Sequence, residues 1–226
     1  MPYTWILFDA DGTLFDYDQA EINALEGAFH DLGLPFIDDY IKTYRAINLQ
    51  VWQDFEAGRV SSIRLRTLRF ERLFEAAGIN ANPADFSRCY LARLARQSVL
   101  MPDAEETVRA LSRQSQMAIV TNGLKDVQRP RLAGSPIADH FAHMIISEEV
   151  GAAKPHPAYF EFVLDHIGRP PLANILIVGD SLTSDIQGGI NAGIDTCWYN
   201  PLGLPNNQPV RPRYVIRTLT EILRIV

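Results

Sequence analysis

The chain has 226 residues, of which 47% are hydrophobic, and a formal net charge of −6 at pH 7. This length and composition exclude a disordered protein and allow one sizeable core with a smaller attached domain. The negative balance argues against a nucleic-acid polymer as partner, because proteins that bind such polymers normally present a basic face.

The cysteines and the length of the apolar runs indicate the cellular context. Cys89 and Cys197 are far apart and lack metal-ligand spacing, so we interpret both as reduced structural thiols. The chain enters its first apolar run within a few residues, which leaves no room for a secretory leader, and no run approaches membrane-spanning length. We therefore expect a cytoplasmic protein without a membrane partner, and the sequence predicts no particular oligomeric state.

The first predicted strand, residues 5–8, leads directly into two acids, Asp9 and Asp11. Two carboxylates at the end of an apolar strand repel each other, so a cation is expected between them. Mg²⁺ fits, because it is held by one or two carboxylates and keeps phosphate oxygens in its shell. An Asp there can bind the metal with one oxygen and attack phosphorus with the other. For an isolated Asp-x-Asp-Gly, the alternative is an ordinary turn.

Residues 16–99 have helical periodicity and contain no convincing strand. Apolar side chains recur there at spacings of three and four, as in Ile22, Leu25 and Phe29, which is typical of helices with one buried face. The pattern predicts a helical domain inserted after the first strand.

The second predicted strand, residues 118–120, ends in Thr121, Asn122 and Gly123. It has the pattern of a buried parallel strand whose carboxyl end offers hydrogen-bond donors. The segment that follows is expected to be helical. Pro130 interrupts it, removes a backbone donor and is expected to kink or delay that helix.

Three more strands are predicted at residues 144–146, 175–178 and 196–199, with an additional edge strand proposed at 214–216. Short Val/Ile/Leu runs that alternate with helical patterns imply parallel strands with crossover helices. The predicted fold class is therefore α/β, a Rossmann-like doubly wound parallel sheet with an inserted helical domain. Residues 1–15 and 100–226 would form the core, and residues 16–99 the insertion.

Three charged residues follow the later strands. Lys154 precedes Pro155, which biases the lysine away from helix, although a lone lysine is usually a solvated surface group. Asp180 follows an apolar strand without a capping partner in view, and Asp185 comes five residues later, where a first-turn helix acid is the alternative. Because ligands bind at the carboxyl ends of parallel strands, we expect these residues to lie near Asp9.

These four segments, in this order, resemble the four motifs of the haloacid dehalogenase superfamily, and more narrowly of its aspartate-dependent phosphatases. The resemblance covers nearly the whole chain. It implies that Asp9 is the nucleophile, that Asp11 is the general acid/base, and that Thr121 and Lys154 hold the phosphoryl oxygens. It also implies that the inserted domain is a cap that closes over the site, excludes water and contacts the leaving group.

The same resemblance implies a Mg²⁺ cofactor. Its ligands would be Asp180, the Asp9 carboxylate and the main-chain carbonyl of Asp11. Asp185 and Asn122 would lie behind these ligands, with Asp185 orienting Lys154 or a metal-bound water. So many acids in one site require that one of them carries a proton in the first step. We expect this acid to be Asp11, because a general acid needs that proton.

Segments 44–58, 68–71, 146–151 and 188–193 look like the bacterial pyrimidine 5′-nucleotidase branch often called YjjG-type. This branch implies a nucleoside monophosphate as the small-molecule phosphate ester. Asn48 and Trp52 share a helix face and, with Arg69, are candidates to contact the base. The alternative is that the aromatic side chains form the core of the cap.

Other functions fit parts of the pattern. A dehalogenase would need neither Asp11 nor Mg²⁺, and a sugar-phosphate mutase would need a cap that retains its substrate through two transfers. A phosphatase for another small phosphoester, such as phosphoglycolate or a sugar phosphate, is the main enzymatic alternative. A phosphate-sensing or scaffold protein is the alternative outside enzymes, and the joint presence of the motif residues argues against it.

Overall fold

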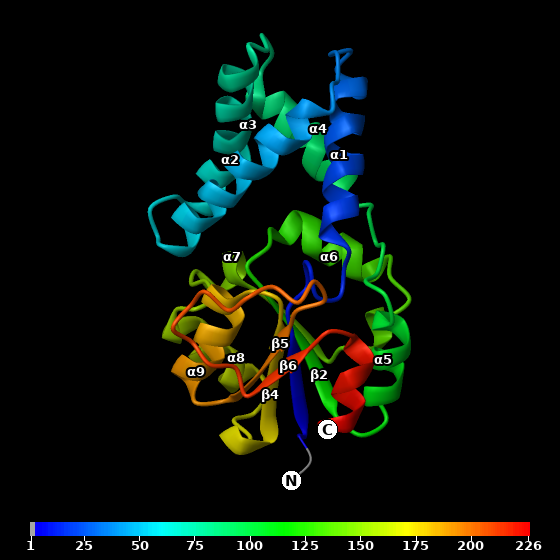
Figure 1. The fold of residues 1–226 in the computed structure, drawn as a ribbon, viewed down its shortest axis with the longest axis vertical. Helices are drawn as coiled ribbons and strands as arrows, with labels where there is room; N and C mark the ends of the chain where they lie inside the picture. Colours follow the sequence, from blue (N-terminus) through cyan, green and yellow to red (C-terminus); the bar gives the residue numbers. More distant parts are fainter. Residues whose placement is uncertain (1–2) are drawn as a thin grey trace. The chain divides into compact units, whose positions relative to one another are not determined.

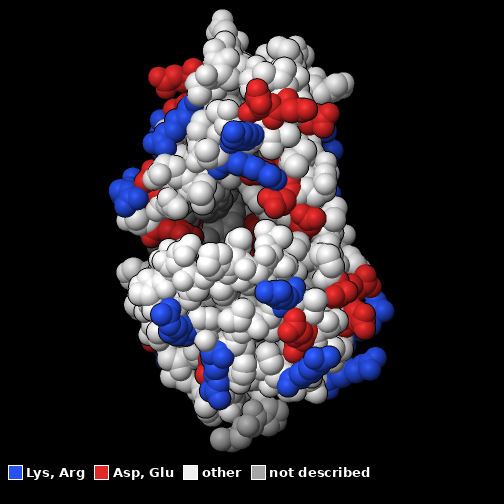
Figure 2. Space-filling model, in the orientation of Figure 1, with Lys and Arg blue, Asp and Glu red and all other residues white. Residues whose placement is uncertain are grey.

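The computed structural model describes residues 3–226, which form two compact units. One unit comprises the chain up to Tyr17 together with Ser98–Val226, and the other is Asp18–Gln97. Residues 1 and 2 of the expected core domain lie outside the described residues. On the face shown in Figure 2, basic and acidic side chains are interspersed.

The first unit is built around a parallel sheet (Figure 1). Its strands are β1 (Trp5–Phe8), β2 (Gln116–Thr121), β3 (His143–Ile146), β4 (Ile175–Gly179), β5 (Asp195–Tyr199) and β6 (Tyr214–Ile216). They lie in the order β3-β2-β1-β4-β5-β6, and every neighbouring pair is parallel. The predicted doubly wound parallel sheet is confirmed, and β6 occupies the edge proposed from the sequence.

Helices cover both faces of this sheet (Figure 1). They are α5 (Ala104–Leu111), α6 (Lys125–Ala133), α7 (Ser147–Val150), α8 (Pro157–His166) and α9 (Gln187–Ala192), with 3₁₀ segments η1 (Ala138–His140), η2 (Leu172–Asn174) and η4 (Leu219–Arg224) and a π-helical turn η3 (Leu182–Ile186). Ile6 and Phe8 of β1 pack with α5 and η4, whereas Leu7 packs with α8. Alternate side chains therefore enter two cores, as expected for a strand buried on both faces.

The register brings the ends of three strands together. Phe8, the last residue of β1, lies opposite Ile119 of β2 and Val178 of β4. The carboxyl ends of these three strands therefore lie side by side. Open α/β sheets bind ligands at this end of the sheet.

Pro130 lies inside α6, which begins at Lys125 and ends at Ala133. The expected delay of this helix is therefore wrong. Proline has no N–H to donate within the helix, yet α6 continues for three residues beyond Pro130.

The second unit is helical, and its described residues contain no strand. Its helices are α1 (Tyr17–Asp31), α2 (Asp39–Glu56), α3 (Ser62–Ala77) and α4 (Pro83–Leu94). The hydroxyl of Ser61 accepts a hydrogen bond from the N–H of Arg64 at the start of α3, and Gly78 ends that helix with φ 64°, as N-caps and C-terminal glycines do. The predicted helical insertion is confirmed.

Candidate active site

Asp9 follows the carboxyl end of β1, an inner strand of the sheet. It is buried, with 8% of its surface exposed. Its N–H continues the parallel pairing by donating to the carbonyl of Val178 at 2.9 Å. Gly12 turns the chain away from the strand with φ +79°, and a Cβ at this position would lie 2.5 Å from Oδ2 of Asp180. Only glycine satisfies both constraints, so this turn brings the backbone after Asp9 against the carboxylate of the neighbouring strand.

Lys154 is the basic side chain that contacts Asp9, and it is 1% exposed. Its Nζ donates to Oδ1 of Asp9 at 2.6 Å, to Oδ1 of Asp185 at 2.6 Å and to the carbonyl of Val120 at 2.7 Å. Burial lowers the pKa of Lys154, but the carboxylates of Asp185 and Asp9 outweigh it and the net shift is upward. The ammonium group is therefore held charged between an acid that follows β1 and an acid of the π-helical turn η3.

Asn122 fixes the backbone of Lys154 from the end of β2. Its Nδ2 donates to the Lys154 carbonyl at 2.9 Å, and its Oδ1 accepts from the Lys154 N–H at 2.8 Å. Beside it, the hydroxyl of Thr121 accepts from the N–H of Gly123 at 3.0 Å and is buried. The Thr-Asn-Gly segment thus places one hydroxyl at the strand end and holds the lysine that comes from a later loop.

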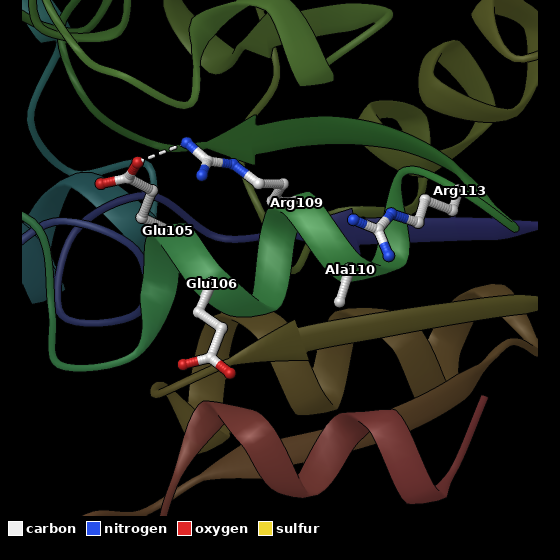
Figure 3. Close-up of a pocket in the computed structure, with 5 residues that line it drawn as sticks. All are labelled: Glu105, Glu106, Arg109, Ala110 and Arg113. Carbon is white, nitrogen blue, oxygen red and sulfur yellow. Dashed lines mark hydrogen bonds and ion pairs between the residues drawn. The ribbon is translucent and has the colours of Figure 1, made fainter.

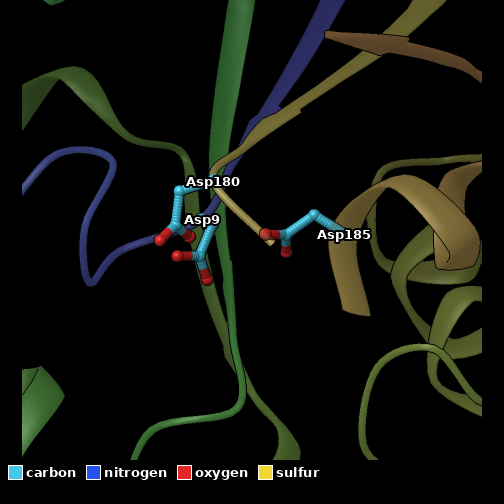
Figure 4. A group of neighbouring side chains, drawn as sticks. All are labelled: Asp9, Asp180 and Asp185. Atoms are coloured by element: carbon cyan, nitrogen blue, oxygen red, sulfur yellow. The ribbon is translucent and has the colours of Figure 1, made fainter. Parts of the chain in front are cut away.

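Three carboxylates converge beside this lysine (Figure 4): each of Asp9, Asp180 and Asp185 offers an oxygen, and these oxygens lie within 4.8 Å of one another. Burial raises the pKa of Asp9, Lys154 lowers it and Asp185 raises it again, with a net value of about 7. Three acids against one lysine leave an excess of negative charge, and the donor atoms are all oxygens. Such a site fits a hard cation such as Mg²⁺, which would restore the ionised form of Asp9.

The carboxylate of Asp11 contacts other side chains than those of the three convergent acids. One of its carboxylate oxygens, Oδ2, accepts from Nε2 of Gln128, and the other forms an ion pair with Arg131. Its carboxylate is not among the three convergent acids, which leaves its main chain as the part available to the cation site. The sequence analysis did not identify Gln128 or Arg131. The signal available was their spacing of three residues, which places them on one face of the helix after the Thr-Asn-Gly segment.

The cap residues considered as base contacts lie in the helical unit. Asn48 is 5% exposed and Arg69 is 1% exposed, and Nη1 of Arg69 donates to Oδ1 of Asn48 at 3.2 Å. Asn48 in turn donates to the buried carboxylate of Glu21 at 3.3 Å. Trp52 is half-buried and packs edge-on against Phe55. Asn48 and Arg69 are therefore parts of an internal polar network of this unit.

A separate pocket lies along α5 and is lined by Glu105, Glu106, Arg109, Ala110 and Arg113 (Figure 3). Glu105 and Arg109 form an ion pair of 2.7 Å across one helical turn, an arrangement common on solvated helices. None of its lining residues belongs to the site described above. Among the described residues, none of the helices combines the length and apolar character needed to cross a membrane.

The family follows from comparison with known proteins. A model of haloacid dehalogenase-like hydrolases matches residues 3–193. The chain belongs to this family. The prediction made from the four motifs is confirmed, and so is the prediction that the protein is a hydrolytic enzyme.

Relatives in the haloacid dehalogenase-like family match along the full length. The pyrimidine 5′-nucleotidase YjjG of Escherichia coli is 33% identical, over 100% of this chain and 99% of the relative. The pyrimidine 5′-nucleotidase PynA of Streptococcus pneumoniae is 35% identical, over 99% and 94%. Both are, by name, phosphoric monoester hydrolases, and the predicted resemblance to the pyrimidine nucleotidase branch is confirmed.

A solved structure in the family is also similar throughout. The magnesium-bound HAD-hydrolase YfnB of Bacillus subtilis superposes with a TM-score of 0.94 at 36% identity, over 100% of this chain and 99% of that chain.

Proposed function

We propose that this enzyme hydrolyses 5′-nucleoside monophosphates, preferentially those of pyrimidines, to a nucleoside and inorganic phosphate through an aspartyl-phosphate on Asp9. The observation that carries the chemistry is the buried carboxylate of Asp9, hydrogen-bonded to Lys154 and next to the carboxylates of Asp180 and Asp185. The substrate class rests on the two full-length nucleotidase relatives.

In the first proposed step, an oxygen of Asp9 attacks phosphorus and the bond from phosphorus to the nucleoside oxygen breaks. Asp11 gives its proton to that oxygen, so the nucleoside leaves as a neutral alcohol. Lys154 and Thr121 stabilise the negative charge that spreads over the phosphoryl oxygens. Lys154 already donates to Asp9 at 2.6 Å, so it is held beside the reacting centre before substrate binds.

In the second step, Asp11 takes a proton from water while the water oxygen attacks phosphorus. The bond between phosphorus and Asp9 breaks, and both phosphate and the free carboxylate are released. Asp9 and Asp180, with the main-chain carbonyl of Asp11, would hold Mg²⁺, which when bound neutralises charge on the phosphate. Asp185 would act on Lys154, which it contacts at 2.6 Å, and Asn122 would fix that lysine through its backbone.

We further propose that the helical unit, Asp18–Gln97, serves as the cap that excludes water and contacts the leaving group. The internal network of Asn48 and Arg69 supports a role for these two residues in holding the cap helices together. A cytoplasmic location stays a prediction.

The test is phosphate release with Mg²⁺ from UMP, dUMP, dTMP, AMP, phosphoglycolate and an aryl phosphate. Asp9→Asn protein serves as the blank, because it keeps the shape of the side chain and removes the nucleophile. A higher kcat/KM for pyrimidine monophosphates than for AMP and phosphoglycolate supports the proposal. Activity on phosphoglycolate or on the aryl phosphate alone keeps the chemistry and overturns the substrate class.

A further inference from the structure

Both carboxylate oxygens of Asp11 are held by side chains of α6. Gln128 donates to one oxygen and Arg131 forms an ion pair with the other. We propose that Gln128 and Arg131 are positioning residues that hold the Asp11 carboxyl group for proton transfer. The inference rests on the proposed function, in which Asp11 is the general acid/base, and assigns to α6 a part in the reaction.

The burial of the two side chains argues against a role in surface solvation. Arg131 is 0% exposed and Gln128 is 1% exposed, and a buried guanidinium is costly unless it is paired. The guanidinium carbon of Arg131 lies 4.7 Å from the ring centroid of Phe15, and the Arg131 carbonyl accepts from the hydroxyl of Ser98 at 2.9 Å. The backbone of this arginine and its guanidinium group are thus both held, and the guanidinium is placed on Asp11.

Arg129, on the same helix, shows the contrasting case. It pairs with Glu149 at 2.5 Å, and its side chain is 53% exposed. Such surface pairs contribute little and depend on salt. Two arginines two residues apart therefore have different surroundings, and Arg129 provides a matched control.

Gln128 is positioned at a cost that stability alone does not explain. Its Oε1 is buried and has no hydrogen-bond partner among the described residues, and an unsatisfied buried acceptor is unfavourable. Unsatisfied groups of this kind call for a specific explanation, catalysis being one. The presentation of the amide nitrogen to Asp11 supplies that explanation.

The backbone leaves room for this contact at Gly123. A Cβ there would lie 2.3 Å from Nε2 of Gln128 and 2.7 Å from its Cγ. Any side chain at this position would displace the amide from Asp11. The glycine that ends the Thr-Asn-Gly segment is thus required by the path of Gln128.

The arrangement turns the Asp11 carboxylate away from the three convergent acids. Asp9, Asp180 and Asp185 share one centre, and Asp11 does not join it. A free aspartate in the same turn could rotate toward a cation bound there and could not then serve a leaving group. Fixing its two oxygens from α6 prevents this, and a displacement of about 1 Å in such a group costs about 100-fold in rate.

The experiment uses two substrates with the Mg²⁺-loaded enzyme. UMP has an alkoxide leaving group that needs the Asp11 proton, whereas nitrophenolate leaves from nitrophenyl phosphate without one. Both substrates need Asp11 to activate water in the second step. The variants are Gln128→Met, which keeps the volume and removes the amide, and Gly123→Ala, which displaces Gln128. Arg129→Met is the control. Asp11→Asn shows the rates expected when the acid/base group is lost completely.

For Gln128→Met and Gly123→Ala we expect kcat with UMP to fall about 10- to 100-fold, as for a weakened acid/base, with KM within about threefold. With nitrophenyl phosphate, rapid mixing should show a burst of nitrophenolate at a nearly unchanged rate. The steady rate after the burst should fall as it does in Asp11→Asn. Arg131→Lys should retain more of kcat than Arg131→Met, because it keeps the charge.

A merely structural role would lower the burst and the steady rate together, and that result overturns the inference. Unchanged or increased kcat in both Gln128→Met and Gly123→Ala also overturns the inference. The contact of Gln128 with Asp11 would then either have no effect on the reaction or slow it. If one variant fails to fold, the other decides. If the wild-type protein is inactive on both substrates, the proposed function is overturned together with the inference. If the wild type is active and only the variants behave differently from expectation, the inference alone fails.

Discussion

Gly179 and Asp185 are in such close contact that a Cβ at position 179 would lie 2.2 Å from Oδ2 and 2.5 Å from Cβ of Asp185. The acid that holds Lys154 therefore packs directly on the backbone at the end of β4. Its second oxygen accepts from the N–H of Ser181 at 3.1 Å. The glycine before Asp180 allows the later acid to reach the lysine.

Gly179→Ala should displace Asp185 from Lys154. Overpacking of this kind should lower the free energy of unfolding by about 1–3 kcal/mol, and kcat should fall more than tenfold because Lys154 loses one of its two acids. Urea unfolding and steady-state kinetics measure the two effects. Gly134→Ala is the control, since its nearest side-chain atom is the Ser98 hydroxyl oxygen at 3.2 Å. Wild-type activity in Gly179→Ala would contradict the assignment of Asp185.

Asn122→Asp should loosen the loop that carries Lys154. The change keeps the shape but replaces the amide donor with a carboxylate oxygen that faces the Lys154 carbonyl. Losing one such buried hydrogen bond should cost about 1–3 kcal/mol of stability, and kcat/KM should fall. Asn207→Asp makes the same chemical change at an exposed position and should do neither. Equal free energies of unfolding in the two variants would show that the hydrogen bonds of Asn122 to Lys154 do not stabilise the protein.

Magnesium should stabilise the protein through the carboxylates of Asp9 and Asp180. After chelator treatment, Mg²⁺ at 100 times its dissociation constant should add about 2.7 kcal/mol to the free energy of unfolding. Asp180→Asn should be more stable than wild type without metal, because it relieves repulsion with Asp9, and should respond weakly to Mg²⁺. Thermal unfolding with and without the ion measures this. The exposed Asp139→Asn should respond as wild type does, and a full response in Asp180→Asn would exclude it as a ligand.

Glu221 should make the stability of the core depend on pH. The N–H groups of Thr218 and Arg217 donate to its carboxylate at 2.9 Å each and lower its pKa. A pKa depressed in the folded state stabilises the protein above the unfolded pKa of about 4.3, and this is lost as pH falls through the folded pKa. Glu221→Gln should therefore be less stable at neutral pH, by at most about 1 kcal/mol for so solvated a group. The difference should vanish in acid, and a difference that persists there would rule out the ionised carboxylate as its cause.

The sequence predicts most of the sheet because its strands are short apolar runs that end in chemically distinctive residues. Asp9, Thr121 and Asp180 each mark the end of a strand, and the parallel register then places them at one edge. The insertion is equally visible because its period changes to that of helices.

The surroundings of Asp11 are not predictable in the same way. Gln128 and Arg131 resemble surface residues of a polar helix, and Pro130 between them draws attention away from that helix. Their burial depends on how α6 packs on the turn after β1, which is a tertiary relationship with no local signal. The same holds for Asn48 and Arg69, which the sequence presents as candidates for ligand contact and the structure places inside the helical unit.

The most direct test of the central claim is to trap the covalent intermediate on Asp9. Asp11→Asn protein, mixed with Mg²⁺ and labelled nitrophenyl phosphate and then quenched in acid, should retain close to one phosphate per chain on the peptide that contains Asp9. Asp9→Asn protein treated in the same way should retain none. Turnover by the wild type with no label on that peptide in any variant would contradict the account, because water would then attack the substrate directly.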